Sequence, residues 1–256
     1  MKNLAGYTLQ GNYTYQVEKG DGYGPSSNYT FLYDRPLGYG DSNLVPHQQW
    51  VLANVYDVPF GKGRHWGANS NKLVDGVFGG WQVSGIFTYY SGIPFMPNIG
   101  SYPSCTDFTA TTCPAADSTG QPYTGPNSVP DVGSGSPYTS TQNRYTWIVT
   151  ETPQQLVAGQ GPFKLPAPNT FGNYPIDTLI GPQFVNLDAS LMKVFSFTER
   201  FKFQLRMDAT NSLNHTNLST PSNNVTGGTA EQITNIAFNG NGYTMRRLQF
   251  SGTLSW

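Results

Sequence analysis

The chain has 256 residues and a net charge of −1, and only 11% of its residues are charged, against about 25% in ordinary soluble domains. This length allows one large domain, and the near-neutral charge offers no basic surface for nucleic acid. Aromatic residues make up 14% of the chain, which also holds 29 glycines and 19 prolines, as is typical of an all-β protein with long loops. The sequence has no run of about 18 apolar residues, which excludes a transmembrane helix.

Six segments alternate between apolar and polar residues with a period of two, the pattern of strands with one apolar face. In chain order they lie near residues 4–17, 48–59, 80–91, 183–195, 200–211 and 245–256. They are about 10 residues long or more, against a soluble mean of roughly 5–6, and about 9–11 residues suffice for a strand to cross a bilayer. We therefore predict an all-β fold, namely a segment of an antiparallel transmembrane β-barrel with about six long strands.

The first segment lies in MKNLAGYTLQGNYTY, which lacks the continuous apolar core of an export signal. We therefore expect the chain to be a fragment of a longer protein. In the second segment the apolar face is ambiguous, because Trp50 and Leu52 compete for it with Val51 and Ala53. The glycine-rich stretch at residues 61–67 follows this strand, but no helical pattern comes after it, so we interpret it as a turn and not as a phosphate loop.

Residues 92–182 separate the third and fourth segments and are rich in Pro, Gly, Ser and Thr. A soluble domain rarely contains so long a structureless connection, so we interpret it as a long external loop. Cys105 and Cys113 lie close together in it, and their spacing favours a disulfide over two free thiols. Several aromatic residues of this loop either bind a solute or anchor the loop, and the sequence leaves both possibilities open: Tyr102, Tyr123, Tyr138, Tyr145 and Trp147.

The charged residues of the fourth and fifth segments fall on one side of their strands. They are Asp188, Lys202, Arg206 and Asp208. A slip of one residue in the register would turn three of these charges toward lipid, at about 2–4 kcal/mol for a basic residue at the bilayer midplane. We expect them to face the barrel lumen and to brace its wall as a cross-strand charge ladder. The alternative is that they contact a plug or a solute.

The sixth segment alternates without a break to the last residue. Leu248, Phe250, Leu254 and Trp256 lie on one side of it, opposite small polar residues. We expect these four residues to face lipid and to act as the signal for insertion by the barrel-assembly machinery.

The connections also alternate in length, as in outer-membrane barrels, where periplasmic turns are short and external loops are long. The turn at residues 196–200 is then periplasmic, and the loops at residues 18–47, 91–182 and 213–244 are external. The connection at residues 60–80 is also periplasmic in this arrangement, although it is long for such a turn.

Three stretches carry a resemblance to a known family. They are YDVPFGKGRHW followed by GGWQVSGIFTYYSGIPF, then NTFGNYPIDTLIGPQFVNLDASLMKVFSFTERFKFQLRMDATNSLNHTNL, and the closing RRLQFSGTLSW. They resemble, in the same order, motifs from the C-terminal barrel of TonB-dependent outer-membrane receptors. The matching group is Oar-like and usually carries a carboxypeptidase-regulatory-like N-terminal domain.

This resemblance implies a 22-stranded barrel plugged by an N-terminal domain, and TonB-driven uptake or export of a large solute. The chain then holds the last six strands, and the plug domain lies outside it. The expected location is the bacterial outer membrane. The expected partners are membrane lipid, the barrel-assembly machinery, the missing plug and strands, an unknown solute, and TonB only through the plug.

Residues with catalytic chemistry do not form a recognisable set. His47, His65 and His215 lack the spacing of a metal site, and the G-x-S-x-G motif of hydrolases is absent. We therefore expect no enzymatic activity, no metal and no cofactor. Two alternatives to the receptor remain: a soluble or surface-attached β-sandwich that binds carbohydrate, and a small outer-membrane barrel to which several copies contribute strands.

Overall fold

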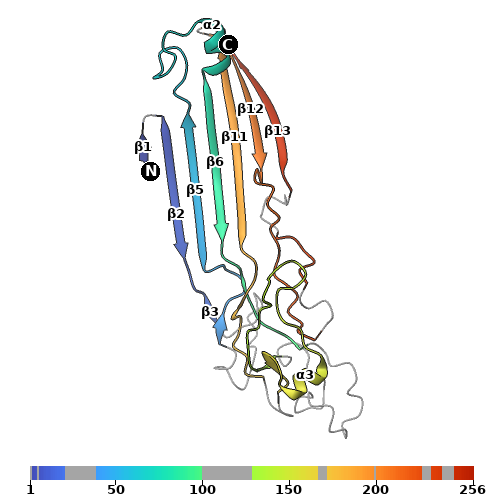
Figure 1. Cartoon of the computed structure of the whole chain (residues 1–256). Helices are drawn as coiled ribbons and strands as arrows, with labels where there is room; N and C mark the ends of the chain where they lie inside the picture. The colour runs from blue at the N-terminus through green and yellow to red at the C-terminus, as the bar shows by residue number, and fades with distance from the viewer. Residues whose placement is uncertain are drawn as a thin grey trace.

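The main element of the fold is a seven-stranded antiparallel sheet in the order β1-β2-β5-β6-β11-β12-β13 (Figure 1). Its strands are β1 (Lys2–Leu4), β2 (Tyr7–Tyr15), β5 (Gln48–Asp57), β6 (Trp81–Tyr90), β11 (Phe184–Ser196), β12 (Lys202–Thr210) and β13 (Arg247–Ser255). The computed structural model describes residues 2–4, 6–20, 39–99, 129–166, 172–198, 200–226, 232–237 and 245–256. The predicted antiparallel all-β fold with six long strands is confirmed.

The start of the sheet differs from the prediction. The strand expected near residues 4–17 begins at Tyr7, because the backbone reverses at Gly6, where φ is 90°, and returns as β1 with Leu4 opposite Tyr7. Glycine adopts this positive φ at little cost. The other five long strands lie within the predicted segments or extend one residue beyond them.

Ladder pairing sorts the strand residues into two faces, because directly opposed residues point to the same side of a sheet. The apolar face includes Tyr7, Leu9, Tyr13, Trp50, Leu52, Tyr56, Trp81, Val83, Phe87, Tyr89, Leu187, Leu191, Phe195, Phe203, Leu205, Met207, Leu248, Phe250 and Leu254. The polar face includes Gln10, Asn12, Thr14, Gln49, Ser84, Thr88, Asp188, Ser190, Lys202, Gln204, Arg206, Asp208, Gln249, Ser251 and Thr253. The register with β6 removes the ambiguity in β5, since Trp50 and Leu52 pair with Tyr89 and Phe87 on the apolar face.

Aromatic rings on the apolar face gather near both ends of the strands. At one end, Tyr13 packs on Trp50 with ring centroids 4.3 Å apart. At the other end, Tyr7 meets Tyr56 edge-on at 6.0 Å, and Phe195 stacks with Phe203 at 6.1 Å. Two aromatic belts flanking an apolar band are the pattern of a membrane-spanning barrel wall.

The connections segregate to the two ends of the sheet (Figure 1). At the turn end, residues 58–80 join β5 to β6 and residues 197–201 join β11 to β12. The tight turn between β11 and β12 closes through backbone hydrogen bonds from Phe197 and Thr198 to the carbonyl of Phe201. The longer connection contains a short helix, α2 (Lys72–Phe78), capped by the side chain of Asn71.

The described parts of the predicted long external loop, residues 92–99, 129–166 and 172–182, are folded and not structureless. Its elements are β7 (Pro94–Phe95), β8 (Asp131–Val132), α3 (Pro153–Ala158), β9 (Phe163–Lys164) and β10 (Leu179–Ile180). With residues 218–226 they form a cap at the end of the sheet opposite the turns. A smaller hairpin of β3 (Lys19–Gly20) and β4 (Gly40–Asp41) lies beside it. Within the described residues, no helix is long and apolar enough to cross a bilayer.

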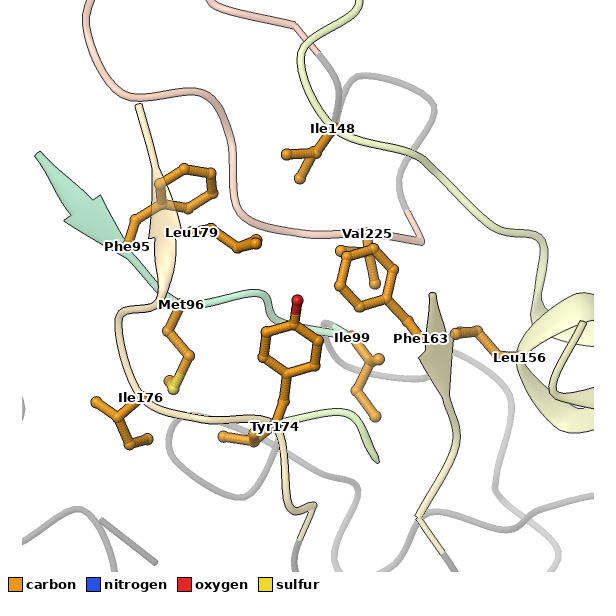
Figure 2. Close-up of a cluster of buried hydrophobic side chains, with 11 residues drawn as sticks. Phe95, Met96, Ile99, Ile148, Leu156, Phe163, Tyr174, Ile176, Leu179 and Val225 are labelled. Carbon is orange, nitrogen blue, oxygen red and sulfur yellow. The ribbon is translucent and has the colours of Figure 1, made fainter. Parts of the chain in front are cut away.

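The cap holds the largest cluster of buried apolar side chains among the described residues (Figure 2). Its members are Phe95, Met96, Ile99, Val129, Ile148, Leu156, Phe163, Tyr174, Ile176, Leu179 and Val225. Ten of them come from the connection between β6 and β11, and Val225 comes from the connection between β12 and β13, so the two connections pack together in the cap. In contrast, the strands of the sheet bury few apolar side chains and leave the apolar face open.

Candidate functional site

The four predicted lumen-facing charges all lie on the polar face, and three of them line one hollow. Arg206 is the centre of the group: its Nε donates to Asp208 Oδ1 at 2.8 Å and to Ser190 Oγ at 3.1 Å. The Arg206 and Asp208 side chains are partly exposed, so this pair contributes at most about 1 kcal/mol to stability. Lys202 lies at the end of β12, opposite Ser255 and Ser196. Asp188, Arg206 and Asp208 therefore form a polar wall that a solute or a plug can contact.

Asp188 has a structural role within this wall. Its Oδ1 accepts hydrogen bonds from the Asn186 side chain at 3.0 Å and from the backbone N–H of Asn211 at 2.9 Å. Asn217 continues the pattern, because its side chain both accepts from and donates to the backbone of Val185. The segment after β12 is thereby held along β11, and the chain is directed into the cap.

These buried asparagines are structural residues that sequence reasoning missed. Asn186, Asn211 and Asn217 are all nearly inaccessible to solvent. For Asn211 and Asn217, the signal is the repeated asparagine in the stretch from residue 211 to residue 217, where no strand pattern explains it.

The polar face carries a hollow of about 340 Å³ over the middle of the sheet. Asp188, Ser190, Arg206 and Asp208 line it on one side, and Val55, Ser84 and Ile86 line it on the other. A second hollow, the mouth hollow, of about 420 Å³, lies where the sheet meets the cap. Its lining includes Gln49, Tyr90, Ile93, Phe184 and Leu218.

The mouth hollow has an aromatic wall on the polar face of the sheet. Tyr90 and Phe184 oppose one another in the ladder and stack with centroids 5.4 Å apart. At its edge Gly92 and Gly181 approach so closely that a Cβ on Gly92 would lie 1.8 Å from the Gly181 carbonyl oxygen. The geometry suits a ligand with a flat apolar surface at the entrance to the polar wall.

The cap decides the role of two aromatic residues that the sequence left open. The Trp147 indole N–H donates to the Ile180 carbonyl at 3.1 Å, and the Tyr138 hydroxyl accepts from the Ile180 N–H at 2.7 Å. Both side chains therefore anchor the cap. Tyr145 is 67% exposed and remains available to a ligand. Tyr102, Tyr123 and the predicted disulfide pair, Cys105 and Cys113, lie outside the described residues.

Burial in the cap raises the pKa of four side chains, including that of Tyr138. Burial, and then the neighbouring Tyr138, raise the pKa of Tyr174 to about 12. Burial, followed by the nearby Asp41 carboxylate, raises the pKa of Asp177 to about 6. Burial also raises the pKa of Glu151, although the Phe163 N–H that donates to its carboxylate opposes the change. Each group is held in a water-poor environment that only a folded cap provides.

The histidines stand in three separate environments. His47 Nε2 lies 3.4 Å from Asp41 Oδ2, His215 Nδ1 lies 3.1 Å from Asn217 Oδ1, and His65 lies beside the ring of Trp66. No group of three metal-binding side chains forms among the residues that the structure describes. The helix α2 follows the turn at residues 61–67, so the expectation that no helix comes after this turn was wrong. However, the Lys62 N–H already donates a hydrogen bond to the Asp75 carboxylate at 2.6 Å, so the chain itself supplies the anion at this turn.

The predicted insertion residues lie at an edge of the sheet. Leu248, Phe250 and Leu254 pair with apolar-face residues of β12 and are exposed, and Trp256 follows the strand with 88% of its surface exposed. This strand therefore offers an apolar strip at the edge of the sheet.

Lys193 is a residue that the sequence analysis missed. It lies on the apolar face near the turn end and is only 3% exposed. Its ammonium donates to the Gly79 carbonyl and lies about 5 Å from the ring centroids of Trp81 (5.0 Å) and Phe195 (4.9 Å). The sequence signal for this residue was a charged side chain at a position of β11 where the alternation predicts an apolar one.

Comparison with known proteins identifies the family. The family described as outer membrane beta barrel domain matches residues 2–249. No curated protein and no solved structure matches the chain. The match covers almost the whole chain, and it agrees with the two faces and the aromatic belts of the sheet. The chain belongs to the outer membrane β-barrel domain family and is located in the bacterial outer membrane.

Proposed function

We propose that this chain forms part of the wall and the external cap of a TonB-dependent receptor that takes up or exports a large solute. The observation that carries the proposal is that both hollows open on the same face of the sheet. The mouth hollow beneath the cap opens on the same face of the sheet as Arg206, Asp208 and the hollow around them. The motifs that resemble Oar-like receptors support the same assignment.

The sheet supports the presence of further strands. Among the described residues, β1 and β13 pair on one side only, so the sheet is open. In a bilayer every backbone polar group needs a partner, which is why strands cross membranes only as closed barrels. In this proposal, strands beyond β1 and β13 complete the wall, and a plug domain fills the lumen.

In this proposal the chain is not an enzyme, and it acts without a cofactor. The apolar face meets outer-membrane lipid, the barrel-assembly machinery inserts β13, and TonB acts only through the plug. Nucleic acid is not a partner. The soluble β-sandwich is no longer a competing interpretation, because the chain belongs to an outer-membrane family.

The experiment is a blot of isolated outer membranes with an antibody against residues 222–244, followed by capture on the immobilised periplasmic domain of TonB. We expect a band several-fold heavier than 28.0 kDa that TonB captures. A heavy band that TonB does not capture would contradict the proposed receptor function, and only the assignment to an outer-membrane barrel would remain.

The open edges also favour a second candidate, an oligomeric barrel in which each copy contributes these strands. A 28.0 kDa band in the outer membrane, which migrates as an oligomer without heating, would support this candidate and contradict the receptor.

A further inference from the structure

The helix α2 at the turn end presents its apolar side chains outward. Leu73, Val77 and Phe78 are 82%, 58% and 58% exposed, and with Val74 they form a stripe at i, i+4 spacing. On the other side of the helix, the Asp75 carboxylate accepts a hydrogen bond from the backbone N–H of Lys62 and faces the turn at residues 61–67. This arrangement is the inverse of a helix on a soluble protein, whose apolar stripe faces the core.

Two hydrogen bonds place the C-terminal end of α2 on the lipid side of the barrel wall. The Trp81 indole N–H donates to the Val77 carbonyl at 2.9 Å, and the Lys193 ammonium donates to the Gly79 carbonyl. Trp81 and Lys193 both belong to the apolar face of the sheet. The helix is therefore fixed to the face that contacts lipid, and not to the face that lines the lumen.

The residues around this attachment are those of a membrane interface. Trp is enriched where the hydrocarbon core meets the headgroups, and Lys extends its ammonium from an apolar surface toward polar groups. Here the Lys193 stem crosses the apolar face while its ammonium lies near the rings of Trp81 and Phe195. The outward stripe of α2 continues this apolar surface at the level of the headgroups.

We propose that α2 is an interfacial anchor that lies in the periplasmic headgroup layer of the outer membrane, with Leu73, Val77 and Phe78 inserted among phospholipid chains. This explains why the connection at residues 60–80 is longer than a periplasmic turn requires. The anchor fixes the depth of β5 and β6 in the bilayer. It rests on the outer-membrane location and does not depend on solute uptake.

The test measures the depth of two neighbouring positions of α2. Leu73→Cys and Lys72→Cys are made separately with Cys105 and Cys113 replaced by serine, and each carries a fluorescent NBD label. The proteins are reconstituted in vesicles of phosphatidylethanolamine and phosphatidylglycerol that contain nitroxide lipids at graded depths. Lys72 is exposed and lies on the side of the helix opposite the stripe, so it is the matched control.

We expect the label at position 73 to be quenched by the lipid nitroxides at about 5–10 Å below the headgroup boundary, and the label at position 72 to be quenched by aqueous iodide. Equal iodide quenching at both positions would overturn the proposal. Protection of position 73 from both quenchers would also overturn it, because a protein would then cover the helix. Val77→Cys repeats the measurement, and heat-modifiable migration on gels shows that each variant is folded.

Discussion

The assignment of the two faces can be tested with a pair of arginine substitutions in β12. Met207 lies in the middle of this strand on the apolar face, between Leu191 and Phe250. Gln204 lies three residues away on the polar face, between Val194 and Thr253. Neither site has a charged residue directly opposite it, so the pair differs mainly in whether the new charge faces lipid or the lumen.

Met207→Arg should destabilise the folded protein by about 2–4 kcal/mol, the cost of a basic residue near the bilayer midplane of a barrel. This corresponds to roughly a 30- to 700-fold change in the folding equilibrium, at about 1.4 kcal/mol for each factor of ten. Gln204→Arg should stay within about 0.5 kcal/mol of the parent, because its side chain remains in water.

The assay is urea unfolding of the protein reconstituted in vesicles, followed by tryptophan fluorescence and by heat-modifiable migration on gels. The reasoning is refuted if the two substitutions cost the same, or if Gln204→Arg costs more. A greater loss for Gln204→Arg would mean that the faces are reversed and that the polar wall described above contacts lipid.

Three further predictions concern the edge strand, the cap and the attachment of α2. Trp256→Ser should reduce the amount of protein assembled in outer membranes, as seen by immunoblot, whereas unchanged assembly would count against its role in insertion. Because the folded-state pKa of Asp177 is raised to about 6 and the unfolded value is about 3.9, the folded cap binds a proton that the unfolded chain releases. Cap stability should therefore fall by about 3 kcal/mol as the pH rises from about 4 to above 6. Asp177→Asn should weaken this dependence in hydrogen exchange of the cap, where the raised pKa of Glu151 accounts for the remainder, and a profile identical to that of the parent would disprove the assignment. Lys193→Met removes a charge-assisted hydrogen bond of about 1.5–3 kcal/mol and cation–π contacts of about 0.5–2 kcal/mol. It should speed tryptic cleavage at Arg64 from the periplasmic side, and an unchanged rate would mean that Lys193 does not hold the turn.

The strands and their two faces could be predicted from the sequence because the signal is local. In β12 every second residue from Phe203 to Ala209 is apolar, and the charges of Lys202, Arg206 and Asp208 alternate with them. When alternate residues of a strand are apolar and the others are charged, only one assignment of the residues to the two faces is possible. The same alternation identified the apolar strip of β13.

Where the alternation was imperfect, the tertiary structure was needed. Trp50 and Val51 are equally plausible on the apolar face of β5, and only pairing with Tyr89 and Thr88 separates them. Lys193 interrupts an apolar series, and its place is explained by Gly79, a residue 114 positions away. No local pattern can encode a contact over that distance.

The cap was decided by the tertiary structure alone. Phe95 and Phe163 lie about 70 residues apart in one loop and Val225 lies in another, and all three are nearly or fully buried in the same cluster. The sequence by itself determined the six long strands and, outside β5, the face that their residues occupy, because backbone geometry repeats every two residues. Where the loops close over the barrel wall, and which polar groups they bury, depends on packing between distant segments.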